Sequence, residues 1–441
     1  MALQEEDSTI IIEIKVPVSK LKVGMFVCRL DKEWVESSFM FQGFLINSEA
    51  VIKKLQEECE YVYIDEKRGI AAEKSLAEIA AQKKVEPKAK KSFFEKLLGS
   101  KDNSLSRKNT LQLSDILDQN ISVEEIKPPA KLVSFDEEME SAKAAHNTAS
   151  ALIKDFMSNV KRGGPVDIIM AKHAVSDCMT SILRSPDAMM LLIRMKSKNY
   201  SLWQHSMNVS VMAINLGRYL NLHDDELVLL GLCGMFHDIG KLRISSTLLE
   251  SAKTPKELTG ILNSHTRVGS EIVLDCMGQL AEVAAQVAYC HHEHLDGSGF
   301  PRGLKGGQIS DYTRMISIVN IYDNLTAAKP GTKALNHYEA MTVLLDKAGQ
   351  HFDEILLSSF NRCLGTYPVG YVVEMNTGEL AMIVEENDTQ RLRPKILLLT
   401  DPEKVPIPKR VVNLADLEFA GAANSYFIKG IVDPEAYGVT L

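Results

Sequence analysis

The stretch HDIGK, at residues 237–241, closes a segment in which apolar residues and glycines recur at helical spacing. This spacing over residues 227–236 predicts a helix. His237 and Asp238 then stand where the helix ends. An imidazole nitrogen beside a carboxylate is a ligand pair that divalent transition metals bind. Because the Asp238 carboxylate has two oxygens, it can serve one cation together with His237 and reach a second cation as well.

The chain has 11 histidines, and several lie in other segments of the same helical region. Helices can project such groups inward from different segments towards one site. Taken alone, each histidine is more readily explained as a hydrogen-bonded core or surface residue. Together they predict a metal cluster made of His205, His237, Asp238, His265, His291 and His292. No such pattern joins the other six, which we interpret as structural: His146, His173, His223, His294, His337 and His351.

A glycine-rich loop, DGSGFPRGLKGG at residues 296–307, follows the paired histidines. Glycines let backbone N–H groups approach a phosphate closely, and Arg302 and Lys305 would supply positive charge. A plain glycine-rich turn is the alternative interpretation. The neighbouring HHE at 291–293 favours the phosphate site.

At 441 residues the chain is longer than one compact core usually reaches, and its texture changes along its length. We expect a small α+β domain over 1–70, a linker over 71–134, a helical domain over 135–364 and a β-rich appendage over 365–441. In the first domain we expect extended pieces at 10–18, 25–30, 41–46 and 61–64 and one helix near 48–60. In the appendage we expect them at 369–373, 380–384 and 395–399.

Lysines surround Pro87 in the expected linker, and polar residues follow them. We expect residues 83–101 to form a flexible spacer. Within it, SFFEKLL at 92–98 is a short amphipathic basic stretch, for which contact with an anionic membrane surface is the alternative.

Composition excludes several classes of protein. Hydrophobic residues make up 45% of the chain, but no run of about 18 apolar residues could form a transmembrane segment. The acidic, polar start at 1–9 does not resemble a secretory signal, and the 7 cysteines are odd in number without a Cys-x-x-Cys pair. These features predict a cytoplasmic protein. A net charge of −8 argues against DNA or RNA as partners.

In order and spacing, HDIGK at 237–241, His265, HHE at 291–293 and DGSGFP at 296–301 resemble the signature of the HD-GYP family. The resemblance spans roughly 150–364. Residues 367–380 are similar to the tail common in these proteins, and 16–65 look like the uncharacterised domain that often precedes them. The resemblance implies a mainly α protein with an all-helical HD-type phosphohydrolase domain. It also implies hydrolysis of cyclic di-GMP, a bacterial second messenger, to linear pGpG, to GMP or to both.

Carried over position by position, the resemblance makes the six clustered residues metal ligands, with Asp238 bridging two divalent transition metal ions, iron or manganese. It places Lys241 near the scissile phosphate as a catalytic group beside Asp238. It makes Asn320 a further ligand. The substrate contacts that it implies are Lys241, Gly299, Phe300, Pro301, Lys305 and Lys329.

The chain departs from the family pattern at several positions. The family usually has aspartate where this chain has Asn320, and aspartate also six residues before the first histidine, at Asn199. Ser201 stands where three-metal members carry glutamate, which favours two ions. An amide oxygen is a neutral and weaker metal ligand than a carboxylate.

The phosphate contacts depart from the pattern too. Lys329 replaces an arginine, Gly331 a tyrosine and Thr332 a basic residue, and Phe300 stands where the family has the tyrosine of its name. Two alternatives to an active enzyme therefore stay open. One is a receptor that binds cyclic di-GMP, or a partner such as a diguanylate cyclase domain, without turnover. The other is hydrolysis of a different nucleotide phosphate. A homodimer is an assembly that the sequence allows.

Overall fold

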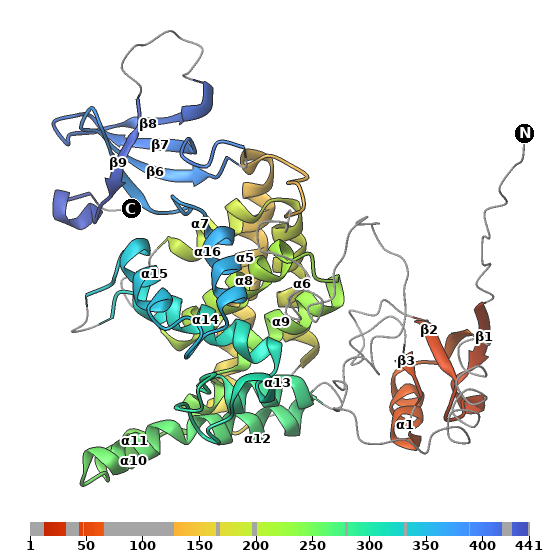
Figure 1. Ribbon diagram of the computed structural model, residues 1–441. Coiled ribbons are helices and arrows are strands. Elements are labelled where there is room, and N and C mark those ends of the chain that lie inside the picture. The colour runs from red at the N-terminus through yellow and green to blue at the C-terminus, as the bar shows by residue number, and fades with distance from the viewer. Residues whose placement is uncertain are drawn as a thin grey trace, which may run out of the picture. The chain divides into compact units, whose positions relative to one another are not determined.

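The computed structural model describes residues 13–31, 44–46, 48–65, 128–164, 168–195, 201–277, 281–329, 333–387, 389–416 and 426–439. It divides into two compact units, Met1–Lys108 and Asn109–Leu441 (Figure 1). The expected spacer at 83–101, with its SFFEKLL stretch, lies outside the described residues, so its flexibility stays a prediction.

The described part of the first unit is a four-stranded antiparallel sheet in the order β1-β4-β2-β3 with one α-helix. Its core consists of apolar residues from the strands and from one face of the helix, such as Val27, Leu55 and Val62. The Asp31 carboxylate accepts hydrogen bonds from the backbone N–H groups of Glu60 and Tyr61 and so ties the turn after the helix to the sheet. The elements are β1 Glu13–Pro17, β2 Phe26–Leu30, β3 Phe44–Leu45, α1 Glu49–Glu58 and β4 Tyr61–Asp65.

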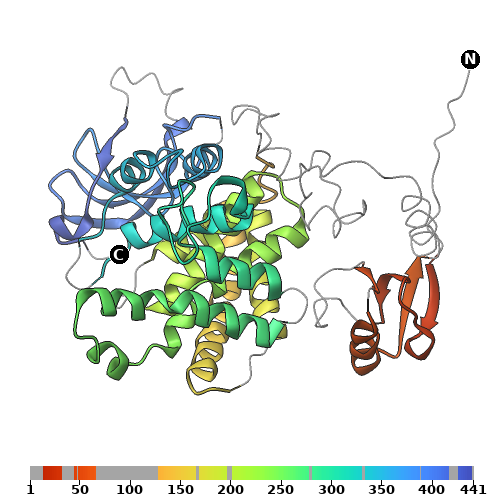
Figure 2. The ribbon, with the colours of Figure 1, turned by 60° about the horizontal axis from the view of Figure 1, so that its bottom comes forward.

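The second unit is mainly helical, as the sequence predicts (Figure 1). None of its described helices combines the length and the apolar character needed to cross a membrane. Helices α10 and α11 lie at the end of this unit away from the C-terminal strands (Figures 1 and 2). The helices are α5 Phe135–Lys161, α6 Ile168–Arg184, α7 Pro186–Arg194, α8 Leu202–Tyr219, α9 Asp224–Phe236, α10 Ser246–Glu250, α11 Pro255–Asn263, α12 His265–Met277, α13 Ala281–Cys290, α14 Asp311–Thr326, α15 His337–Leu345 and α16 Glu354–Leu364.

Helix α9 is the centre of the helical core, since every residue from Glu226 to Phe236 is buried. Its glycines explain how closely it packs on α8. A Cβ added at Gly234 would lie 2.8 Å from the Ser210 Cα. The Ser210 hydroxyl also donates a hydrogen bond to the Gly231 carbonyl at 2.8 Å. The two helices that lead into the predicted metal cluster are therefore held in one fixed relation.

The chain closes with a five-stranded antiparallel sheet in the order β8-β7-β6-β5-β9. Two of its strands were not expected from the sequence. One of them, β8, carries Pro406 and Pro408, which lack the N–H that a central strand needs, and it accordingly lies at the edge of the sheet. The strands are β5 Val372–Met375, β6 Leu380–Glu385, β7 Lys395–Thr400, β8 Pro406–Asn413 and β9 Ile428–Ile431.

A hydrogen-bond network joins this sheet to the helices. Arg194, at the end of α7, donates to the Tyr322 hydroxyl of α14 and to the Tyr371 hydroxyl beside β5, each at 2.8 Å. Gly370 has a φ of +86° and lies so close to Arg194 that an added Cβ would stand 2.6 Å from the arginine Cβ. The start of the C-terminal sheet is thus fixed against the helix that carries Asn320.

Candidate metal centre

The six clustered residues come from helical segments far apart in the sequence. His205 lies in the first turns of α8, and His237 is the C-cap of α9. Asp238 is the N-cap of a short 3-10 helix, Ile239–Arg243. His265 is the first residue of α12, while His291 and His292 directly follow α13.

Four imidazoles surround the Asp238 carboxylate. Asp238 Oδ2 lies 3.3 Å from the Nε2 atoms of both His205 and His237. On its other side, Oδ1 lies 3.3 Å from His265 Nε2 and 3.4 Å from His291 Nε2. Each carboxylate oxygen therefore faces its own pair of ring nitrogens, which is the arrangement expected of a carboxylate shared by two ions.

The other ring nitrogen of three of these histidines bonds the backbone. His237 Nδ1 donates to the Gly234 carbonyl at 2.7 Å, His265 Nδ1 to the Leu262 carbonyl at 2.6 Å and His291 Nδ1 to the Ala288 carbonyl at 3.0 Å. A carbonyl only accepts hydrogen bonds, so the proton sits on Nδ1 and the Nε2 lone pair faces Asp238.

His205 is oriented by a carboxylate instead. Its Nδ1 lies 2.7 Å from Asp323 Oδ2 on α14, and Asn208, one turn further along α8, donates to Asp323 Oδ1 at 3.0 Å. Burial raises the pKa of Asp323 to about 7, while Arg194 acts in the opposite sense. Hydrogen bonding of this kind behind a metal-binding histidine fixes its ring and raises its basicity.

Burial is the largest influence on the charge states in the cluster. It lowers the pKa of His205 and of His291 to about 4 and also lowers that of His292. Burial opposes ionisation of Asp238, but the imidazoles around it, His237 foremost, hold the pKa of its carboxyl well below the usual range. At neutral pH the imidazoles of His205, His291 and His292 are therefore neutral, and the Asp238 carboxylate is charged. These are the protonation states that bind metal ions.

These residues fit two divalent ions. In each of two groups, the potential ligand atoms all lie within 4.8 Å of one another, and Asp238 belongs to both groups. Asp238 is fully buried, yet its Oδ1 accepts no hydrogen bond from any described residue. A buried carboxylate oxygen is normally satisfied, and a cation would satisfy this one. The first group consists of His205, His237 and Asp238. The second group consists of Asp238, His265, His291 and His292.

Lys241 lies at the rim of the cluster. Its Nζ is 2.5 Å from Asp238 Oδ2, while 41% of its side chain is exposed. A glycine next to it makes this geometry possible, because a Cβ at Gly240 would stand only 2.0 Å from the His265 carbonyl oxygen. The HDIGK turn can therefore lie directly against the start of α12.

The glycine-rich loop packs against the second pair of histidines. The Phe300 ring stacks on the His292 ring, with centroids 4.6 Å apart, and its peptide bond to Pro301 is cis. A Cβ at Gly299 would lie 2.4 Å from the His292 carbonyl oxygen, so only glycine allows this approach. Glu293 anchors the loop by accepting from the N–H groups of Arg302 and Leu304. Of the predicted substrate contacts, Gly299, Phe300 and Pro301 thus stand beside the cluster.

Lys305, unlike Gly299, Phe300 and Pro301, does not lie against the histidine cluster in the part of the chain that the structure describes. Its side chain extends over Gly297, where an added Cβ would stand 2.5 Å from Lys305 Cε. None of its contacts within the described residues reaches the histidines, so its predicted role in holding phosphate stays a prediction.

Asn320 is buried on α14 and belongs to a chain of amide contacts. Its Oδ1 accepts from Asn324 Nδ2 at 2.7 Å, and Asn324 Oδ1 in turn accepts from Lys329 Nζ at 2.5 Å. Lys329 also interacts electrostatically with Asp238 and Lys241, which places its charge near the cluster. Asn199 lies outside the described residues, as do Gly331 and Thr332, and Ser201 is the N-cap of α8.

Sequence reasoning missed the residues that orient the others. Asp323 and Asn324 were visible as neighbours of Asn320, and Asn208 follows His205 at helical spacing, but no local pattern pairs α8 with α14. Sequence reasoning also missed a second cluster of potential metal ligands. His294 and His351 stack with centroids 3.8 Å apart, and with Asp296 they form a further group of potential ligands.

Three family models match the chain in order. A domain of unknown function (DUF3391) matches residues 13–171, an HD domain matches 188–356, and a KOW domain associated with HD domains matches 372–439. The HD match contains all six clustered residues.

Named relatives match as well. The chain is 30% identical over 407 residues to a cyclic di-GMP phosphodiesterase of Pseudomonas aeruginosa, covering 91% of this chain and 88% of that protein. It is 29% identical over 168 residues to a 3'3'-cGAMP-specific phosphodiesterase of Vibrio cholerae, covering 38% of this chain and 36% of that protein. Among solved structures, an HDG"Y"P protein from Bdellovibrio bacteriovorus aligns with a TM-score of 0.39 and 16% identity, covering 80% of this chain and 99% of that one.

Proposed function

The chain belongs to the HD-GYP family of cyclic di-GMP phosphodiesterases, and from this premise we propose that it hydrolyses cyclic di-GMP itself, in the cytoplasm, to linear pGpG, to GMP or to both. The observation that carries the proposal is the pair of ligand groups that share Asp238. A retained bridging carboxylate with five retained histidines supports catalysis more than binding alone, because a receptor has no need of a shared ligand between two ions.

Phosphodiesterases with this domain depend on metal ions, and we propose that His205, His237, Asp238, His265, His291 and His292 hold two of them, iron or manganese. When bound, such ions would supply Lewis acidity towards a phosphoryl oxygen and would lower the pKa of a neighbouring water. Asn320 would add a neutral oxygen ligand through Oδ1, whose orientation Asn324 fixes.

Side chains of the protein would stabilise charge on the phosphate and bind the base of the substrate. Lys241, at the partly exposed rim, would stabilise negative charge on the phosphoryl group, and Lys329 would add a second positive charge nearby. Phe300 offers an aromatic face beside His292, where a guanine base of the substrate could stack. Gly299 and Pro301 would shape the loop that carries this face.

The test is a turnover assay. Protein purified without oxygen and reconstituted with Fe²⁺ or Mn²⁺ is incubated with cyclic di-GMP, and products are separated by chromatography. We expect metal-dependent formation of pGpG or GMP, and no product with His237→Ala. A parallel assay with 3'3'-cGAMP determines which cyclic dinucleotide is preferred. Tight binding of cyclic di-GMP without turnover under either metal would overturn the proposal in favour of a receptor.

A further inference from the structure

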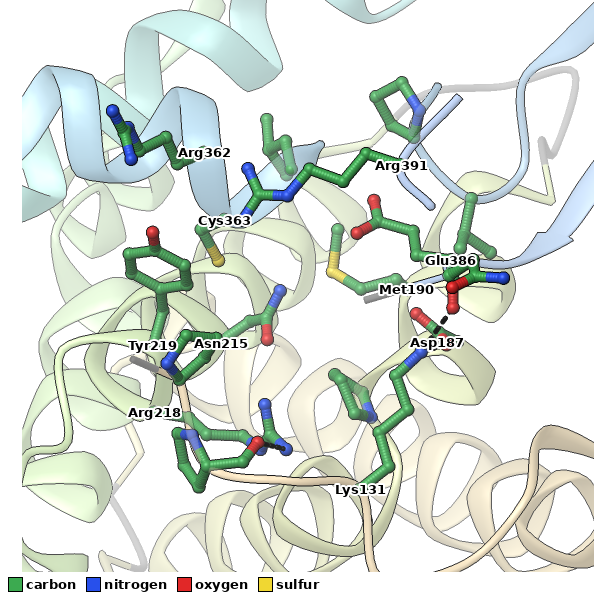
Figure 3. A pocket seen from close by; sticks show the side chains of 17 residues that line it. Lys131, Asp187, Met190, Asn215, Arg218, Tyr219, Arg362, Cys363, Glu386 and Arg391 are labelled. Carbon is green, nitrogen blue, oxygen red and sulfur yellow. Dashed lines mark hydrogen bonds and ion pairs between the residues drawn. The ribbon is translucent and has the colours of Figure 1, made fainter. Parts of the chain in front are cut away.

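A second polar pocket lies where α7, α8 and α16 meet the residues that follow β6 (Figure 3). None of the predicted metal ligands lines it. Asn215, which does, stands ten residues along α8 from His205, a separation of about 15 Å at the helical rise. The free space is about 60 Å³, room for roughly five water-sized groups. A phosphate or a similarly small anionic group fits this space, whereas a whole cyclic dinucleotide does not.

The charge of the lining favours an anion. Four basic side chains and two acidic ones surround the space: Lys131, Arg218, Arg362 and Arg391, and Asp187 and Glu386. One acid is already neutralised, because Lys131 Nζ lies 2.5 Å from Asp187 Oδ2. Apart from this pair, the lining has three arginines and one acid, Glu386.

The second acidic residue of the lining, Glu386, packs closely against a glycine. Glu386 lies against Gly365, which has a φ of +71°, and a Cβ there would stand 2.5 Å from the carboxylate Oε1. The carboxylate thus occupies the side of the pocket next to the end of α16.

Arg218 is anchored before any ligand arrives, and the other two arginines lie near Tyr219. Arg218 is only 5% exposed, and its Nη2 donates to the carbonyls of Pro129 and Ala130 at 2.8 and 3.3 Å. Arg362 and Arg391 both lie close enough to Tyr219 to oppose the rise in its pKa that burial causes. A guanidinium group anchored as that of Arg218 is loses little freedom when it binds an anion.

Asn215 adds a neutral hydrogen-bonding group to the lining. The residue is only 6% exposed and contributes to the wall of the pocket. Figure 3 shows this amide directed into the pocket. The amide nitrogen can donate two hydrogen bonds to an anion in the pocket.

We propose that this pocket is a second anion site, which binds a phosphate group through Arg391, Arg362 and the Asn215 amide. The bound group links α8 and α16 to the residues that follow β6, and so stabilises the junction between the helices and the C-terminal sheet. The proposal does not depend on turnover at the metal centre.

The experiment is isothermal titration of the metal-loaded full-length protein with inorganic phosphate and with pyrophosphate, at constant ionic strength in chloride. A chelator-treated sample separates this site from the metal centre, where phosphate can also bind. The variants are Arg391→Gln, which removes one exposed charge, and Asn215→Ala. Arg267→Gln, an exposed arginine on α12, is the matched control.

We expect phosphate binding to persist after chelation and to weaken roughly 10-fold in each pocket variant, since a hydrogen bond to a charged group contributes about 1.5–3 kcal/mol. Arg267→Gln should bind as the wild type does. Phosphate should also raise the melting temperature of the wild type more than that of Arg391→Gln. Equal affinities in the wild type and Arg391→Gln would overturn the proposal, and so would binding that vanishes entirely on chelation of a protein that stays folded.

Discussion

His205 Nδ1 lies 2.7 Å from Asp323 Oδ2, and this contact turns His205 Nε2 towards Asp238. The two residues lie on different helices, α8 and α14. The carboxylate that orients the first histidine thus belongs to the same helix as Asn320. A change on α14 can therefore alter the metal centre without touching a ligand.

Asp323→Ala should weaken metal binding roughly 10- to 100-fold, the usual effect of removing a hydrogen-bond partner behind a ligand. The affinity is measured by competition with a chelator. Asp311→Ala, in the first turn of the same helix, is the control and should retain wild-type affinity. Equal affinity in both variants would contradict the role assigned to Asp323.

Metal stoichiometry should distinguish the shared ligand from the others. Asp238→Ala is expected to lose both ions, because Asp238 belongs to both ligand groups. His205→Ala and His292→Ala should each retain close to one ion per chain, since each belongs to a single group. Elemental analysis of protein reconstituted without oxygen gives the numbers. Retention of both ions by Asp238→Ala would rule out the bridging role.

Asn320→Asp should increase metal retention, because a charged oxygen replaces a neutral one at a buried position. Asn324 Nδ2 already donates to the Asn320 side-chain oxygen and can donate to the new carboxylate in the same way. Turnover of cyclic di-GMP should persist or rise in the variant. His237→Ala serves as the inactive control. A variant that binds metal more weakly than the wild type would count against Asn320 as a ligand position.

Two glycine substitutions should differ sharply in their effect on stability. Gly240→Ala forces a Cβ to within 2.0 Å of the His265 carbonyl oxygen and should lower the free energy of unfolding by roughly 1–3 kcal/mol or more. Gly260→Ala, in α11, meets nothing within 4 Å and should be neutral or stabilising by about 0.5–1 kcal/mol. Chemical denaturation monitored by circular dichroism compares them. Equal stability of both variants would mean that the HDIGK turn does not need its close approach to α12.

His337 should contribute to acid sensitivity. Burial lowers the pKa of His337 to about 3, against about 6.5 in the unfolded chain. Between these values the unfolded state binds a proton that the folded state does not, so stability falls as pH falls from 6.5 towards 3. At pH 5 the loss is about 2 kcal/mol for this residue.

His337→Gln should therefore reduce the difference in unfolding free energy between pH 7.5 and pH 5 by roughly 2 kcal/mol relative to the wild type. His146→Gln is a useful comparison, because burial also lowers the pKa of His146. An unchanged pH dependence in His337→Gln would show that His337 becomes protonated in the folded protein.

Local motifs mark four of the six clustered residues, while His205 and His265 stand alone in the sequence and were grouped with them by spacing and by the family resemblance. HDIGK, HHE and the glycine-rich loop each identify a position by adjacent residues, and the family resemblance supplies their order. Helical spacing also predicted α9. Burial on every face of α9, and the close approach of Gly234 to Ser210, depend on partners that spacing does not reveal.

What could not be predicted depends on how distant helices align. The contact of His205 with Asp323 requires the rotation of α8 relative to α14, and the alignment of Asn215, Arg362 and Arg391 requires three separate segments to meet. The fold of Lys305 over Gly297 follows from the positive φ of 83° at that glycine, which allows the loop to turn back on itself. Strand β8 escaped notice because its two prolines are typical of loops.

Arg194 joins the Tyr371 hydroxyl beside β5 to the Tyr322 hydroxyl next to Asp323. We therefore expect the helices and the C-terminal sheet to unfold together and not as separate units. A fragment that ends at Leu364 would strip the Arg194 guanidinium of one hydroxyl acceptor and expose the helical surface that β6 covers on α7.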